Sequence, residues 1–83
     1  MKIHHYTAIF QKEPEGGYTV IIPALPGCVT YGKTIEEAAA AGQEAIESYL
    51  GSLAKDNEAA PLDVSFVSTI DVHEEARHPL AYA

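Results

Sequence analysis

Apolar and polar positions divide the chain into four strand-like segments and one long helical segment. Tyr, Thr, Val, Ile and Phe are concentrated in residues 3–12, 18–22 and 28–31, a composition typical of β-strands. Apolar residues recur at helical spacing over residues 34–55, and residues 64–72 again alternate between apolar and polar side chains. The pattern predicts an α+β fold of order β-β-β-α-β, in which one helix packs on a small, mainly antiparallel sheet.

Prolines and glycines mark the connections between these segments. The run from Pro14 to Gly17 is typical of a turn, because glycine adopts a positive φ without steric cost, and the first two strands should therefore pair as an antiparallel hairpin. Pro23 ends the second strand, since proline cannot donate a ladder hydrogen bond. Pro26 and Gly27 then form a second turn before the short third strand.

The helical segment begins with a capping box. The Thr34 hydroxyl can accept a hydrogen bond from the Glu37 amide, and the Glu37 carboxylate can reach back to the Thr34 amide. The predicted inner stripe of the helix consists of apolar residues at helical spacing: Ala38, Ala39, Ala45, Ile46, Tyr49, Leu50 and Leu53. Gly42 falls on this stripe. Glycine costs about 1 kcal/mol relative to alanine inside a helix, so its presence indicates a close approach to the sheet.

The predicted strands carry apolar side chains on both faces. In the second strand Val20 and Ile22 alternate with Ile21, and in the first strand Ile9 lies opposite Phe10. One helix covers only one face of a sheet, and antiparallel sheets with a solvated second face usually alternate more cleanly. We therefore expect a homo-oligomer, in which a second copy or another partner covers the remaining apolar face.

Composition and charge narrow the possible functions. The 83 residues suffice for one domain, and a hydrophobic content of 47% argues against a disordered chain. No run approaches the roughly 20 apolar residues of a membrane span, and we expect a cytoplasmic protein without membrane contact. The net charge of −7 opposes binding to the phosphate backbone of nucleic acids. A basic protein partner is more compatible with this charge than DNA or RNA, although acidity also simply favours solubility.

Four sequence features together resemble the HicB-like antitoxin family. They are the EGGYTV hairpin, the P-x-LPGC corner from Pro23 to Cys28, the TYGKT step, and the helical run EEAAAAGQEAIESYL. This resemblance covers most of residues 1–53, and it implies the partial RNase H-like fold of the N-terminal domain of HicAB toxin–antitoxin systems. In that family the domain neutralises a small HicA toxin, an mRNA-cleaving protein with a double-stranded-RNA-binding-like fold.

The sequence departs from the family pattern at three positions and at its C-terminal end. Ala24, Lys33 and Ala41 stand where relatives often carry an acidic residue, Asp and Asn, respectively. We assign residues 1–72 to a HicB-like domain and residues 73–83 to a C-terminal tail. Many relatives carry a DNA-binding domain there, and eleven residues are too few for one, so we expect no direct contact with nucleic acid.

The resemblance predicts an antitoxin that binds a basic HicA-like toxin through its surface. Glu44 and Glu47, on the acidic side of the helix, are candidate contacts by charge complementarity, although they could equally form an ordinary solvated face. Tyr31 is a further candidate, because tyrosine is enriched at interfaces. The alternative is a stand-alone homo-oligomeric assembly or ligand-binding module without a toxin.

Catalysis is not expected from this sequence. RNase H-like chemistry requires several carboxylates that converge on metal ions, and Asp71 is the only acidic residue inside a predicted strand. A nucleophilic Cys28 would need a base or another means of lowering its pKa, and a single cysteine in a strand is more often a buried apolar residue. His4 and His5 are neighbours in a strand and point to opposite faces. We therefore predict no catalytic residue, no metal site and no cofactor.

Overall fold

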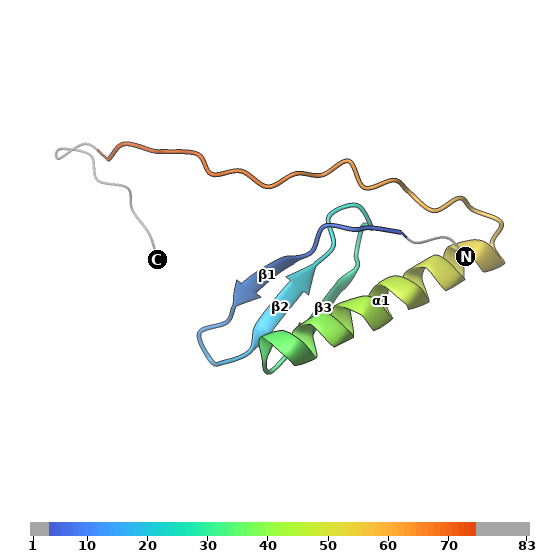
Figure 1. Ribbon diagram of the computed structural model, residues 1–83, viewed down its shortest axis with the longest axis horizontal. Helices are drawn as coiled ribbons and strands as arrows, with labels where there is room; N and C mark the ends of the chain where they lie inside the picture. Colours follow the sequence, from blue (N-terminus) through green and yellow to red (C-terminus); the bar gives the residue numbers. More distant parts are fainter. Residues whose placement is uncertain (1–3, 75–83) are drawn as a thin grey trace.

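The computed structural model describes residues 4–74, and its elements follow one another in the order β-β-β-α (Figure 1). The strands are β1 (Ile9–Lys12), β2 (Tyr18–Ile21) and β3 (Val29–Gly32), and the helix is α1 (Ile35–Lys55). The strands form one antiparallel sheet of order β1-β2-β3. The predicted α+β arrangement is confirmed, although β1 is shorter than the 3–12 segment expected from composition.

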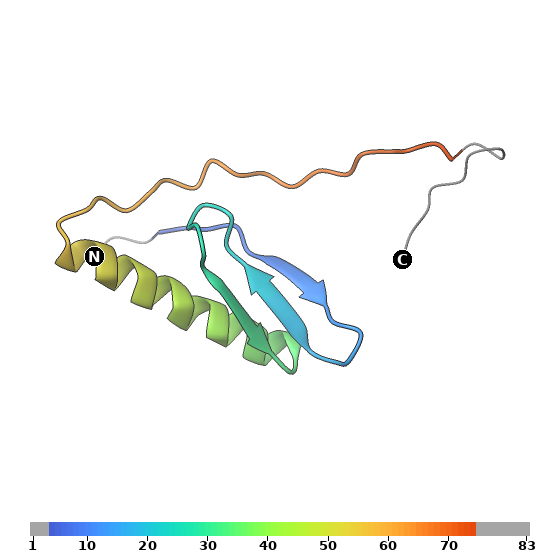
Figure 2. The ribbon, with the colours of Figure 1, turned by 180° about the vertical axis from the view of Figure 1, so that it is seen from behind.

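The register of the sheet separates its two faces. Phe10 pairs with Val20, and Val20 pairs with Thr30, so these three side chains share the face that α1 covers. The next row pairs Ile9 with Ile21 and Ile21 with Val29 on the opposite face. Figure 2 shows β3 nearest to α1 and β1 farthest from it. The helix therefore covers the sheet unevenly.

The corner between β2 and β3 supplies part of the core. The Leu25 amide donates to the Ile22 carbonyl (3.0 Å), and the Cys28 amide donates to the Leu25 carbonyl (2.9 Å). Pro26 and Gly27 occupy the middle of the second of these turns, and Gly27 has a φ of 80° that glycine adopts without strain. Leu25 is fully buried, so this corner is part of the hydrophobic core and not an exposed loop.

The capping box predicted at the start of α1 comprises two hydrogen bonds, and the structure contains one of them. The Thr34 hydroxyl accepts from the Glu37 amide at 3.0 Å, as expected. The Glu37 carboxylate accepts from the Lys33 amide at 3.2 Å, not from the Thr34 amide. The expected reciprocal bond is thus displaced by one residue, because the carboxylate reaches past the cap to the preceding amide. At the other end, Asn57 has a φ of 58°, which stops the helix after the Asp56 cap.

A small apolar core joins α1 to β2, β3 and the corner. Its fully or largely buried members are Val20, Ile22, Leu25, Cys28 and Ala38. Partly buried apolar residues surround them: Tyr6, Tyr18, Ala45, Ile46, Tyr49 and Leu50.

Two glycines lie where the helix contacts the sheet. A Cβ atom at Gly42 would lie 3.4 Å from Val20 Cγ1, an ordinary van der Waals contact, so the helix is near the sheet at this position but the packing does not require glycine. A Cβ atom at Gly32 would overlap the backbone of Ala38.

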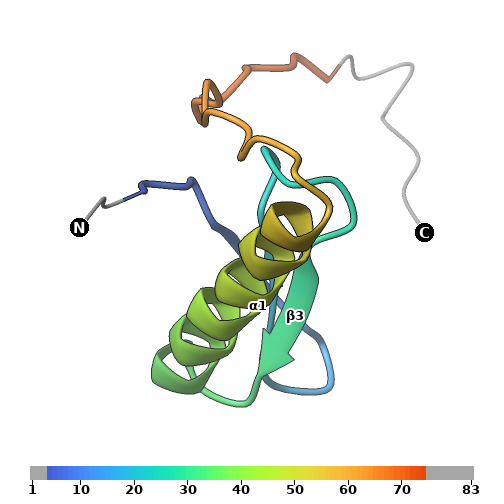
Figure 3. The same ribbon diagram turned by 90° about the vertical axis from the view of Figure 1, so that its right-hand side faces the viewer.

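The segment predicted as a fourth strand is where the structure departs from the expected order. Residues 56–74 contain no helix or strand, and residues 64–72 pair with no other strand in the described part of the chain. Figure 3 shows this segment leaving the end of α1 and running apart from the sheet. We call residues 61–74 the arm. The predicted tail of residues 73–83 lies outside the described residues except for residues 73 and 74.

Candidate functional site

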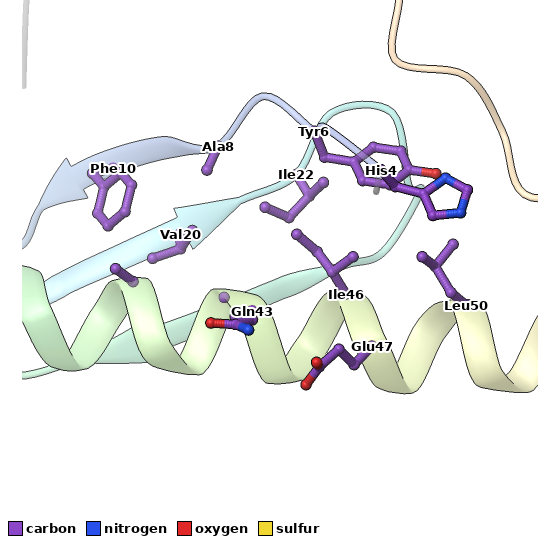
Figure 4. A pocket seen from close by; sticks show the side chains of 12 residues that line it. His4, Tyr6, Ala8, Phe10, Val20, Ile22, Gln43, Ile46, Glu47 and Leu50 are labelled. Atoms are coloured by element: carbon purple, nitrogen blue, oxygen red, sulfur yellow. The ribbon is translucent and has the colours of Figure 1, made fainter. Parts of the chain in front are cut away.

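A groove opens between β1 and α1 because the helix packs on the β2–β3 side of the sheet. Figure 4 shows its side chains, which come from the segment before and within β1, from β2 and from one side of the helix. The groove has a volume of about 560 Å³. It is lined by His4, Tyr6, Ala8, Phe10, Val20, Ile22, Ala39, Gly42, Gln43, Ile46, Glu47 and Leu50. Most of these side chains are apolar, so the groove is suited to an apolar group rather than to a charged one.

The alternation of β1 and the spacing of α1 together create the groove. Tyr6, Ala8 and Phe10 are two residues apart and therefore line one side of the extended chain. Ile46 and Leu50 are four residues apart and face them from the helix. The sequence shows both patterns, but the space between them depends on where the helix sits. The groove was therefore absent from the predicted sites.

The base of the arm is hydrogen-bonded to the segment that precedes β1. The Tyr6 hydroxyl donates to the Pro61 carbonyl at 2.7 Å, and the Tyr6 ring stacks on His4 with 6.3 Å between the ring centroids. The Thr7 amide donates to the Asp63 carboxylate, and the Ser65 amide donates to the same carboxylate at 2.9 Å. These bonds hold the pKa of Asp63 below its usual value, with the Ser65 amide as the largest cause.

Beyond its base, the arm exposes apolar side chains to solvent. Six large apolar residues of this segment are 67–87% exposed: Leu62, Val64, Phe66, Val67, Ile70 and Val72. All except Val67 occupy even-numbered positions, so they would share one face of an extended strand. An exposed apolar set of this size is typical of an interaction surface.

The open face of the sheet carries a second apolar row. Ile9, Ile21 and Val29 lie side by side across the three strands on the face away from α1. Tyr31 belongs to the same face and is 50% exposed. Its hydroxyl donates to the Gly16 carbonyl at 3.0 Å, and its ring end lies where a Cβ atom at Gly17 would be. Tyr31 thus stabilises the β1–β2 turn and still presents part of its ring to solvent.

Glu44 and Glu47 lie on the helix, away from Tyr31. Both are exposed, and their spacing of three residues places them on neighbouring positions of the helix surface. Glu47 also lines the groove, whereas Glu44 does not. The structure therefore brings the two glutamates together but places Tyr31 on the other side of the sheet. One flat partner surface cannot contact all three residues.

Among the groups considered for chemistry, Cys28 lies in the core. Cys28 is buried, and burial raises the pKa of its thiol, which disfavours the nucleophilic thiolate. Within residues 4–74, no three side chains of His, Cys, Asp or Glu lie close enough together to hold a metal ion. In the same part of the chain, no helix is both long enough and apolar enough to span a membrane.

The observed order of three strands and a helix agrees with the resemblance noted in the sequence, and comparison with known proteins decides the assignment. The sequence model of one protein family, the HicB-like antitoxins of bacterial toxin–antitoxin systems, matches residues 6–80 of the chain. The chain belongs to this family.

Curated relatives of this HicB-like chain bear the name UPF0150 protein. The relative from Thermoplasma acidophilum is 52% identical over 58 residues, which cover 70% of this chain and 84% of the relative. The Synechocystis relative is 37% identical over 71 residues, which cover 86% and 90% of the two chains. The Helicobacter pylori relative is 41% identical over 68 residues, which cover 71% of this chain and 93% of the relative. The likeness therefore extends over most of each protein.

Membership in the HicB-like family implies an antitoxin role and, in general, a toxin partner. It also favours a non-enzymatic function. The described residues expose apolar side chains in the groove, on the arm and on the open sheet face, and α1 exposes several glutamates. Surfaces of both kinds can bind another protein.

Proposed function

We propose that this HicB-like protein neutralises a basic, mRNA-cleaving HicA-like toxin by covering its RNA-binding surface. The observation that carries the proposal is the family match over residues 6–80, which implies an antitoxin role. The net charge of −7 supports a partner of opposite charge. Because the toxin's substrate is mRNA, the encounter takes place in the cytoplasm.

The acidic side of α1 is the surface we assign to the toxin. Glu44 and Glu47 are exposed neighbours, and α1 also carries Glu36 and Glu37 in its first turn. Charge complementarity of this kind mainly raises the association rate and the selectivity of a complex. Tyr31 cannot belong to the same contact, and we assign it to a separate apolar contact on the open sheet face.

A charge-reversal experiment tests the acidic surface. The chain is co-expressed with any small basic protein that a neighbouring gene encodes, and a complex is isolated by pull-down. Its affinity is then measured at several salt concentrations. We expect E44K/E47K to weaken the complex about tenfold or more and to flatten its salt dependence, because two attractive charges become repulsive. Growth of cells that express the toxin should slow accordingly.

The matched control is E15K/E58K, which changes the net charge equally at two exposed positions outside α1. This variant should bind nearly as well as the unmodified chain. Equal losses in both variants would reduce the effect to overall charge, and an unchanged E44K/E47K affinity would remove this surface from the proposal. Absence of any complex with a neighbouring basic protein would contradict the antitoxin function itself.

The second candidate function is a stand-alone homo-oligomeric module that works without a toxin. The observation that favours it is the amount of apolar surface left exposed on the arm and on the open sheet face. Isolation of a stable oligomer that captures no neighbouring basic protein, and that does not protect cells from one, would favour this function.

A further inference from the structure

The free edge of β1 lies beside the groove. In the order β1-β2-β3, β1 pairs only with β2, so its other edge has no strand partner among the described residues. An unpaired edge presents a row of N–H and C=O groups and readily accepts a further strand. A strand added here would also place its side chains over the apolar groove between β1 and α1.

The arm has the pattern that such a strand needs. Its even-numbered positions carry Val64, Phe66, Ile70 and Val72, interrupted by Ser68. Its odd-numbered positions carry Ser65, Thr69 and Asp71, interrupted by Val67. An extended segment with this alternation has one apolar and one mainly polar face. Figure 1 shows that the arm runs in the same general direction as β1 without approaching its edge.

The base of the arm is held beside Thr7 by the side chain of Asp63. The Thr7 amide, two residues before β1, donates to the side chain of Asp63 and not to a main-chain carbonyl. The Ser65 amide donates back to the same carboxylate, so it is also unavailable to an edge strand. The base of the arm is therefore held through a side chain, and the large apolar side chains that follow it are exposed to solvent.

We propose that the arm of one chain adds to the free β1 edge of a second copy and that its apolar face covers the groove of that copy. A two-fold pair satisfies both surfaces at once, because each chain provides one arm and one groove. The large apolar side chains on the even-numbered face of each arm would leave water in this way: Leu62, Val64, Phe66, Ile70 and Val72. This number is compatible with the roughly 1,000 Å² that a specific interface buries. The inference does not depend on the proposed toxin.

Paired variants with matched controls test the exchange in the purified chain. Phe66→Asp places a charge on the apolar face of the arm, and Thr69→Asp places the same charge on its polar face. Ala39→Glu extends a charged side chain into the groove, and Ala40→Glu introduces the same residue at the exposed neighbouring position. All four positions tolerate substitution in a folded chain, because Phe66 is 87% exposed and the others lie at the surface or in the open groove.

The molecular mass in solution is measured by light scattering at micromolar concentration, and folding is checked by far-UV circular dichroism. We expect the unmodified chain to have at least twice the mass of one chain. Phe66→Asp and Ala39→Glu should each halve that mass, and Thr69→Asp and Ala40→Glu should leave it unchanged. A monomeric unmodified chain, or an unchanged mass for Phe66→Asp, would overturn the proposal.

A mixing experiment separates exchange between copies from docking within one chain. The Ala39→Glu protein has an intact arm, and the Phe66→Asp protein has an intact groove. If arms are exchanged, an equimolar mixture of the two should contain heavier particles than either variant alone. If each arm docks on its own groove, or if the occupant is a different protein, the mixture should keep the mass of its components. That result would contradict the exchange.

Discussion

The body of the molecule, residues 9–55, and the arm, residues 61–74, show that the same sequence pattern has different outcomes. Val20 in β2 and Ile22 directly after it alternate with more exposed residues and are buried in the core with α1. In the arm, Val64 and Phe66 alternate in the same way but are more than 85% exposed. The β2 segment has neighbours on both edges, whereas the arm has none among the described residues. Alternation therefore indicates a capacity to form a strand, and a partner at the edge decides whether the strand forms.

The largest difference between the two regions should appear when a leucine is shortened in each. Leu25→Ala removes a fully buried side chain from the core, and we expect the free energy of unfolding to fall by about 2–5 kcal/mol. Leu62→Ala removes an 84% exposed side chain and should change the unfolding of a single chain by less than about 0.5 kcal/mol. Urea unfolding, performed at low protein concentration, measures both. Similar losses would mean that the arm belongs to the core.

The close contact between β3 and α1 should be sensitive to a single methyl group. Gly32→Ala introduces a Cβ atom that would overlap the backbone of Ala38, and we expect a loss of about 1–3 kcal/mol in unfolding free energy. Gly51→Ala is the matched control, because a Cβ atom there meets nothing within 4 Å. Since alanine favours helix, the control should gain about 0.5–1 kcal/mol. Thermal unfolding distinguishes the two, and a neutral Gly32→Ala would show that this packing adapts.

The smallest effect should be found at the base of the arm, where it is set by pH. Hydrogen bonds lower the pKa of Asp63 in the folded chain, so its ionised form is the one that stabilises the arm base. This contribution is complete above the usual aspartate pKa and is lost as the pH falls through the lowered one. We therefore expect hydrogen exchange of the Thr7 amide to become relatively less protected in that acidic range.

Asp63→Ala should remove this pH dependence and reduce Thr7 protection at neutral pH, whereas Asp71→Ala, in the exposed part of the arm, should leave both unchanged. Exchange measured by NMR over this pH range gives the answer. A Thr7 amide that is equally protected in Asp63→Ala would exclude the carboxylate as its acceptor.

Local residue chemistry was sufficient to predict most elements of the body. The Thr34 cap, the helical stripe around Ile46 and the turn at Gly27 depend on neighbours within a few positions, and each occurs where it was expected. The Glu37 bond was predicted for the wrong amide, because two adjacent amides lie within reach of a flexible carboxylate. The groove could not be predicted, since it depends on how far α1 extends across the sheet.

For the candidate contacts, sequence spacing placed Glu44 and Glu47 together, because helical periodicity fixes their relative positions. It could not relate them to Tyr31, which is separated from them by the thickness of the sheet. The role of all three in binding remains a prediction, and the variants described above test the acidic pair.

The sequence by itself determined the helix, the turns, the alternation of the strands and the membership in the HicB-like family, because these follow from short-range backbone preferences and residue identity. Only the tertiary structure decided which apolar residues find a partner. The position of α1, which packs on β2 and β3, left the groove beside β1. The bonds of Asp63 hold the base of the arm beside Thr7, and the rest of the arm pairs with no strand among the described residues. Burial is a property of elements that meet in space, so an apolar pattern alone cannot say what will cover it.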